Sequence, residues 1–119
     1  MTDHDSVEAM VKKTLDMFGN IDALVNNAVS VTNKLFMDQP REEYEKDNHL
    51  NYVGMVNCTR AVLDNMIEHK DGRTINISSD TGLIDQSRGA VYSGNKAAAI
   101  AFVKSIGQGD AMALSYEVT

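Results

Sequence analysis

Apolar residues first recur along the chain at the spacing of a helix. Over residues 6–18 they return every three or four positions, which predicts an amphipathic helix with one face turned inward. Asp5 and Glu8 have the spacing of a capping box at its start, and Gly19 follows its last apolar residue as a stop signal. We therefore expect the first helix to begin after Asp5 and to end before Gly19.

The remaining segments alternate between strand and helix patterns. Residues 21–25, "IDALV", form a short apolar run that is typical of a buried parallel strand, and residues 26–39 predict a loop. A long helix over 40–68 starts at a proline, which favours the first turn of a helix. The sequence "RTINIS", from Arg73, predicts a second buried strand, and a third helix is expected over 91–106.

This helix–strand–helix–strand–helix order is typical of α/β proteins whose strands run parallel. It predicts a partial Rossmann-like fold, a doubly wound parallel sheet, with residues 1–119 forming a single domain. The last four residues, "YEVT", fit the beginning of a further strand.

Composition and charge narrow the classes of function. Hydrophobic residues make up 43% of the 119 positions and charged residues 24%, as in a globular protein. A net charge of −6 argues against a nucleic-acid partner or an anionic membrane surface, and no apolar run approaches the roughly 20 residues of a bilayer span. A lone Cys58 and an acidic N-terminal stretch favour the cytoplasm, and the three histidines lack metal-ligand spacing, so no metal is expected.

Candidate chemistry lies in the stretch "AVYSGNKAAAIAF", which places Tyr92 and Lys96 one helical turn apart. In open α/β sheets, ligands gather beyond the carboxyl ends of the strands, where Asn26–Ala28 and Ser79 are expected. A nearby ammonium favours the phenolate and lowers the pKa of a tyrosine from its usual value of about 10. Such a tyrosine can exchange a proton with an alcohol or carbonyl oxygen, while a serine hydroxyl holds that oxygen. By spacing alone, however, most such pairs are surface residues.

Four segments, in the right order, resemble the short-chain dehydrogenase/reductase family. They are "IDALVNNAV", "NYVGMVNCTRAVLDNM", "GRTINISSDTG" and "YSGNK". The last carries the family's Tyr-x-x-x-Lys signature, and Ser79 stands 13 residues before Tyr92, which is the family's serine-to-tyrosine interval. The matches extend over most of the chain, from Val7 to Ile106.

The resemblance implies an NAD(P)-dependent oxidoreductase that interconverts a secondary alcohol and a ketone. Tyr92 would be the acid and base, and Ser79 would orient the substrate oxygen. Lys96 would lower the tyrosine pKa and bind the nicotinamide ribose. Asn51, which matches the family's active-site asparagine, would hold a water in a proton relay; a solvent-facing asparagine in mid-helix is the alternative.

The same resemblance places Asn26 and Ala28 near the adenosine side of NAD or NADP, with Asn26 partly structural. The sequence also differs from the family in the segments that would bind the nucleotide. The Gly-rich turn and the first three strands have no counterpart, so we expect residues 1–119 to be the catalytic half of a truncated family member, which also lacks the C-terminal region that covers the substrate. Val29 stands where the family has glycine.

Two functions therefore remain open. One is the oxidoreductase acting on a small alcohol or ketone, and the asparagine helix is similar to that of the bacterial 3-oxoacyl reductase branch. The other is a catalytically inert product with at most an association role, because the Gly-rich dinucleotide motif is absent. The resemblance also implies a homo-oligomer through helices 40–68 and 91–106, although apolar faces that cover the sheet explain these helices equally well.

Overall fold

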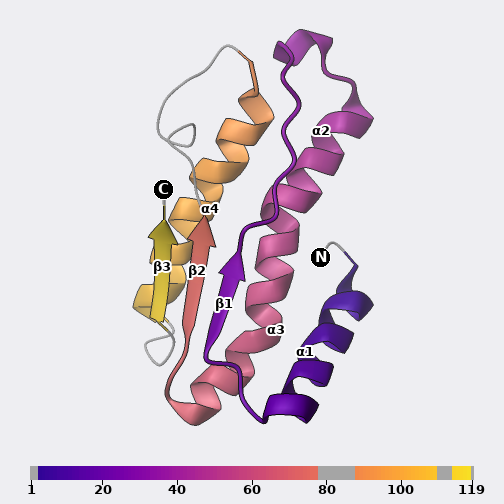
Figure 1. Ribbon diagram of the computed structural model, residues 1–119. Coiled ribbons are helices and arrows are strands. Elements are labelled where there is room, and N and C mark those ends of the chain that lie inside the picture. The colour runs from indigo at the N-terminus through magenta and orange to yellow at the C-terminus, as the bar shows by residue number, and fades with distance from the viewer. Residues whose placement is uncertain (1–2, 78–87, 110–113, 119) are drawn as a thin grey trace.

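Within the described part of the chain, three parallel strands form one sheet. Strand β1 (Ala23–Asn26) pairs with β2 (Arg73–Ile77), and β2 pairs with β3 (Leu114–Val118), in the spatial order β1-β2-β3 (Figure 1). The parallel sheet expected from the alternating pattern is confirmed, and β3 overlaps the segment "YEVT" for which a further strand is predicted. The computed structural model describes residues 3–77, 88–109 and 114–118.

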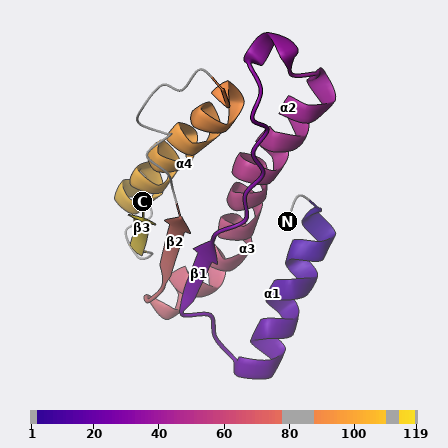
Figure 2. The same ribbon diagram turned by 45° about the horizontal axis from the view of Figure 1, so that its top comes forward.

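Helices cover one face of this sheet. Helix α3 (Gly54–His69) packs behind β1, and α4 (Ala90–Gly109) packs behind β2 and β3 (Figures 1 and 2). Helix α1 (His4–Phe18) lies beside α3, and α2 (Arg41–Asn48) precedes α3 in the chain and leads into its N-terminal end. None of the helices in the described ranges is long and apolar enough to span a membrane.

A small apolar cluster joins α1, the entry to β1 and α3. Its members are less than a tenth exposed and include the fully buried Met66. Because these residues come from segments that are far apart in sequence, their burial fixes α1 against α3 and sets where β1 begins. The cluster consists of Val11, Ile21, Val62, Leu63 and Met66, with Leu15, Leu24 and Ala61 packed against it.

The start of α1 differs from the prediction. The helix begins at His4, and Asp3 is its N-cap, accepting a hydrogen bond from the Asp5 amide at 3.1 Å. The predicted capping box at Asp5 is therefore wrong, because Asp5 lies in the first turn, where its charge favours the helix dipole. Gly19 ends the helix as predicted, with a φ of 80° that glycine adopts without strain.

The helix predicted over 40–68 begins at Arg41, with Pro40 as its N-cap, and continues to His69, but it is not uniform. A π turn, His49–Val53, separates α2 from α3. Such a turn inserts an extra residue and widens the helix, and π turns are frequent at functional sites. A hydrophobic pattern read at one average period does not reveal it.

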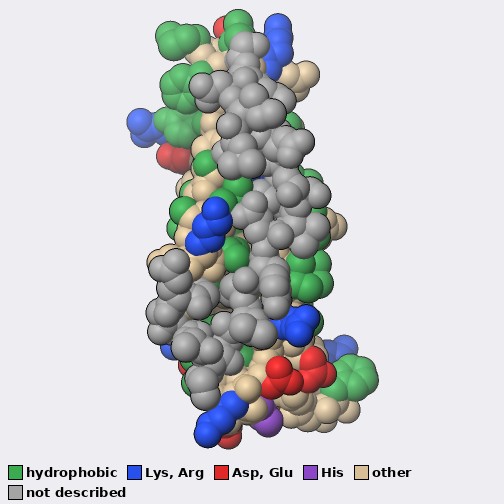
Figure 3. Space-filling model, turned by 90° about the vertical axis from the view of Figure 1, so that its left-hand side faces the viewer, with side chains coloured by type: hydrophobic (Ala, Val, Ile, Leu, Met, Phe, Trp, Pro, Cys, Tyr) green, Lys and Arg blue, Asp and Glu red, His purple; other side chains and the backbone are tan. Residues whose placement is uncertain are grey.

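The molecule is elongated, with principal extents of 47 × 28 × 18 Å (Figure 3). Its upper end is formed by the loop after β1 and by a short 3-10 helix, η1 (Phe36–Asp38). Hydrophobic side chains gather at this end in Figure 3, where Leu35, Phe36 and Met37 are exposed. The predicted polar site residues Asn26, Asn51 and Lys96 do not lie at this end but near the carboxyl ends of β1 and β2.

Candidate functional site

A small cavity lies at the carboxyl ends of β1 and β2, the edge at which open α/β sheets bind ligands. Its volume is about 10 Å³, near the lower limit for one water molecule. Four of the predicted site residues meet in its wall, from β1, the following loop, the π turn and α4. The lining residues are Asn26, Ala28, Leu50, Asn51, Met55, Asn76, Ile77, Lys96 and Ala99.

Tyr92 and Lys96 lie one turn apart near the start of α4, as their spacing predicts. The Lys96 Nζ is 5.8 Å from the centre of the Tyr92 ring, close enough for a cation–π contact. Lys96 is only 6% exposed, and its ammonium donates a hydrogen bond to the backbone oxygen of Ile77 at 3.2 Å. Burial lowers the pKa of Lys96.

Asn51 lies within the π turn and is 3% exposed. Its Oδ1 accepts a hydrogen bond from the Ser30 amide at 2.9 Å, and its Nδ2 donates to the Ser30 carbonyl oxygen at 2.6 Å. The alternative of a solvent-facing asparagine is therefore wrong. The side chain holds the loop after β1 against the helix.

Asn26 forms the centre of a buried polar network beneath the cavity. Its Nδ2 donates to Asn76 Oδ1 on the neighbouring strand at 2.8 Å and to Thr59 Oγ1 on α3 at 3.2 Å. Asn76 Nδ2 in turn contacts Met55 Sδ at 2.8 Å. The contacts give Asn26 a structural part, tying β1 to β2 and to α3. Its Oδ1 is buried and has no hydrogen-bond partner among the described residues.

The other predicted residues stand as follows. Ala28 is half-buried and lines the cavity, whereas Val29, which follows it, is 50% exposed. Ser79 lies outside the described residues, so its predicted role stays a prediction.

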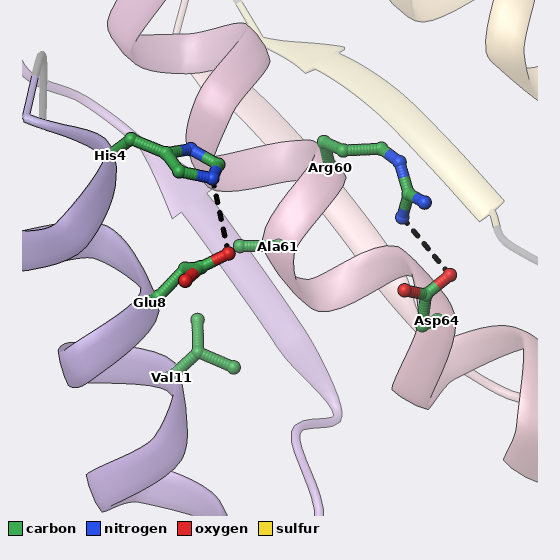
Figure 4. Close-up of a pocket in the computed structure, with 6 residues that line it drawn as sticks. All are labelled: His4, Glu8, Val11, Arg60, Ala61 and Asp64. Carbon is green, nitrogen blue, oxygen red and sulfur yellow. Dashed lines mark ion pairs between the residues drawn. The ribbon is translucent and has the colours of Figure 1, made fainter.

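A wider cleft of about 340 Å³ lies between α1 and α3, away from the strand ends (Figure 4). Its polar side chains pair within their own helices, His4 with Glu8 at 3.1 Å and Arg60 with Asp64 at 3.0 Å. None of the predicted site residues lines this cleft, so it is not the candidate reaction site. Among the described residues, no group of three histidine, cysteine or acidic side chains could hold a metal.

Sequence reasoning did not identify Ser30, Gln39 and Asp47, which form a second buried network next to Asn51. The one available signal is Asp47 itself, which stands four residues before Asn51 and so shares its helix face. An acidic residue on an inward face needs partners, and sequence spacing does not say where they come from.

Curated relatives match nearly the whole chain. The sequence model described as short chain dehydrogenase matches residues 1–112. Over 102 residues the chain is 39% identical to the 3-oxoacyl-[acyl-carrier-protein] reductase of Synechocystis sp., covering 86% of this chain and 41% of that protein. It is 38% identical to the human dehydrogenase/reductase SDR family member 7, covering 89% of this chain and 31% of that protein. The chain thus spans about two fifths or less of these relatives' length.

Solved structures agree on the fold. A short-chain dehydrogenase from Streptomyces avermitilis superimposes with a TM-score of 0.90 at 26% identity, covering 98% of this chain and 43% of that one. An alcohol dehydrogenase from Thermococcus sibiricus, complexed with 5-hydroxy-NADP, gives 0.91 at 27% identity, covering 98% and 49%. The predicted Rossmann-like class is confirmed, and the chain belongs to the short-chain dehydrogenase family.

Proposed function

We propose that the protein is an NAD(P)-dependent oxidoreductase that interconverts a secondary alcohol and a ketone, with Tyr92 as the acid and base. The observation that carries the proposal is the buried Lys96 ammonium, 5.8 Å from the Tyr92 ring, at the carboxyl ends of the strands. In this proposal the Lys96 ammonium stabilises the negative charge that develops on the phenol oxygen as its proton leaves. Tyr92 can then take the proton of an alcohol, or return it to a ketone oxygen.

In this proposal Lys96 binds the nicotinamide ribose of the dinucleotide, and Ala28 lies on its adenosine side. An ammonium has three N–H donors, and one of those of Lys96 goes to Ile77, which leaves donors for ribose hydroxyls. Ala28 is small and lies at the strand end, so a ligand can approach the backbone there. The 5-hydroxy-NADP bound to the Thermococcus sibiricus enzyme supports the same class of cofactor. When bound, NAD or NADP exchanges hydride with the substrate carbon.

The other residues have supporting parts in this proposal. Ser79 holds the substrate oxygen, as its interval to Tyr92 in the family motif suggests. Asn51 and Lys96 both line the water-sized cavity, so a water held there can pass protons between Lys96 and solvent. The side chain of Asn51 is occupied by Ser30 and acts by fixing the wall of that cavity.

The variant Tyr92→Phe tests the proposal, because it removes only the phenol oxygen. With NADPH or NADH and a panel of simple secondary alcohols and ketones, we expect kcat to fall by roughly 10²–10⁴-fold. Nucleotide affinity, followed by its fluorescence, should stay within a factor of about three of the wild-type value. Tyr52→Phe is the matched control, since Tyr52 is also half-buried but packs its ring on Phe102. Equal turnover by wild type and Tyr92→Phe would refute the role of Tyr92.

A second candidate is an association role without catalysis. A groove of about 450 Å³ between α3 and α4 supports it, because apolar side chains dominate its wall. It is lined by Val56, Thr59, Arg60, Leu63, Asp64, Ile67, Phe102 and Ile106. A second copy joined through helices 40–68 and 91–106 would cover this groove. Light scattering on the samples used for the nucleotide titration separates the two candidates: an oligomer that binds no nucleotide favours association.

A further inference from the structure

A carboxylate is buried at the end of α2 and is held by neutral donors. Asp47 is 2% exposed. Its Oδ1 accepts a hydrogen bond from the Ser30 hydroxyl at 2.8 Å, and its Oδ2 accepts one from Gln39 Nε2 at 3.0 Å. Both donors come from the segment between β1 and α2, so Asp47 binds this segment through two hydrogen bonds.

Asp47 has no cationic partner among the described residues, since their ion pairs involve other carboxylates. Burying a carboxylate is costly unless hydrogen bonds replace its hydration, and charged acceptors form stronger hydrogen bonds than neutral ones. An apolar residue at position 47 would avoid this cost. The carboxylate therefore serves to order the groups that donate to it, Ser30 and Gln39.

Ser30 connects this network to the candidate site. Asp47 and Asn51 lie four residues apart, and both bind Ser30: Asn51 takes its amide and carbonyl, and Asp47 takes its hydroxyl. All three polar groups of Ser30 are thus fixed by one side of the helix. Two residues earlier, Ala28 lines the same cavity as Asn51 and Lys96.

A further tie holds the same loop at its outer end. Lys34 forms an ion pair with Glu43 of α2 at 2.8 Å. The carbonyl oxygen of Lys34 accepts a hydrogen bond from the Gly89 amide at 3.2 Å. Gly89 directly precedes α4, the helix of Tyr92 and Lys96. The loop is therefore tied to α2, which continues into the π turn of Asn51, and to the residue before α4, while Asp47 holds the part next to the cavity.

We propose that Asp47 is a positioning residue, which orders the segment from Ala28 to Ser30, together with Asn51, on the nucleotide side of the site. The proposal rests on the proposed NAD(P)-dependent function, to which it adds a residue that touches neither nucleotide nor substrate. Asp47 acts through Ser30, so the two side chains should affect nucleotide binding as one unit.

The variants Asp47→Ala and Ser30→Ala, their double variant and Asp47→Asn test this inference. Asp47→Ala leaves the donors of Ser30 and Gln39 unpaired, whereas Asp47→Asn keeps the shape and hydrogen bonds, because a hydroxyl and a primary amide can each donate or accept. Val62→Ala is the control, since it loosens the apolar cluster without touching the network.

Two readouts are needed. The first is the exchange rate of the Ser30 amide hydrogen, measured by NMR relative to that of Val103, a buried residue of α4 outside the apolar cluster. We expect this ratio to rise about tenfold in Asp47→Ala, the effect of losing one hydrogen bond to a charged group, and to stay unchanged in Val62→Ala. The second is the dissociation constant for NADPH or NADH. We expect it to rise about tenfold in Asp47→Ala and in Ser30→Ala, no further in the double variant, and to recover most of the way in Asp47→Asn.

The outcomes separate the inference from the function on which it rests. Unchanged Ser30 exchange in Asp47→Ala overturns the inference whatever the nucleotide does. Faster exchange with unchanged nucleotide affinity also overturns it, because Asp47 is then structural only. If the wild-type protein binds no nucleotide, the proposed function fails, and the exchange readout still decides whether Asp47 orders the segment.

Discussion

The buried bond between Asn26 and Asn76 should couple β1 to β2 directly beneath the candidate site. The perturbation is Asn26→Ala, which removes the donor of two hydrogen bonds, 2.8 Å to Asn76 and 3.2 Å to Thr59. Both acceptors are almost fully buried, with Asn76 3% and Thr59 2% exposed. Water therefore cannot readily replace the lost donor.

The expected cost follows from these contacts. Leaving a buried acceptor such as Asn76 Oδ1 without a partner costs about 1–3 kcal/mol. The loss at Thr59 is smaller, because a hydroxyl can rotate and donate instead. The unpaired Oδ1 of Asn26 also disappears, which offsets part of the cost. We therefore expect the free energy of unfolding to fall by about 2 kcal/mol in Asn26→Ala.

A double-mutant cycle isolates the direct bond. Asn26→Ala, Asn76→Ala and the double variant are unfolded in urea and followed by circular dichroism. The double variant should be more stable than the sum of the single effects predicts, by about 1 kcal/mol, since the shared hydrogen bond is lost only once. Asn33→Ala, in the exposed part of the loop, serves as the control and should change stability by less than about 0.5 kcal/mol. Additive single effects would refute the direct coupling of the strands through this pair.

Two further predictions concern α3, the turn before β2, and α4. In Gly72→Ala the new methyl would clash with the Met66 side chain, so the free energy of unfolding measured in urea should fall by about 1–3 kcal/mol. In Gly94→Ala the new methyl meets open space, so the free energy of unfolding should rise by up to about 1 kcal/mol. Equal effects of the two variants would contradict the packing of Met66. Burial lowers the pKa of Lys96 below its usual 10.5, so the folded state binds this proton less well than the unfolded state does. The wild-type protein therefore becomes more stable as the pH rises from the pKa of Lys96 in the folded state to its value of 10.5 in the unfolded state. The stability of Lys96→Met relative to wild type should therefore fall as pH rises toward 10.5, and a difference that is constant with pH would speak against a buried ammonium.

The sequence predicts the order of elements well, because each has a strong local signal. The apolar run at residues 21–25 marks β1 within a few positions, and Gly19 ends α1 because it adopts a positive φ. The contact of Tyr92 with Lys96 is also predictable, since residues four apart on a helix are neighbours whatever the rest of the fold does.

The parts that the sequence does not predict depend on tertiary contacts or on small changes of helix geometry. The π turn alters the backbone around Asn51 without altering the average hydrophobic period. The bonds from Asp47 to Ser30 and Gln39 join residues 17 and 8 positions apart through a loop with no regular pattern. The start of α1 depends on which of two nearby aspartates reaches the free amides.

Nucleotide binding tests the central claim most directly, namely that Lys96 and the strand ends form the dinucleotide site of an oxidoreductase. The measurement is a fluorescence titration of the protein and of Lys96→Met with NADPH and NADH. We predict binding at micromolar concentration for the wild-type protein and affinity at least tenfold weaker for Lys96→Met. No binding by the wild-type protein at millimolar nucleotide, or equal affinity for both proteins, would contradict the claim.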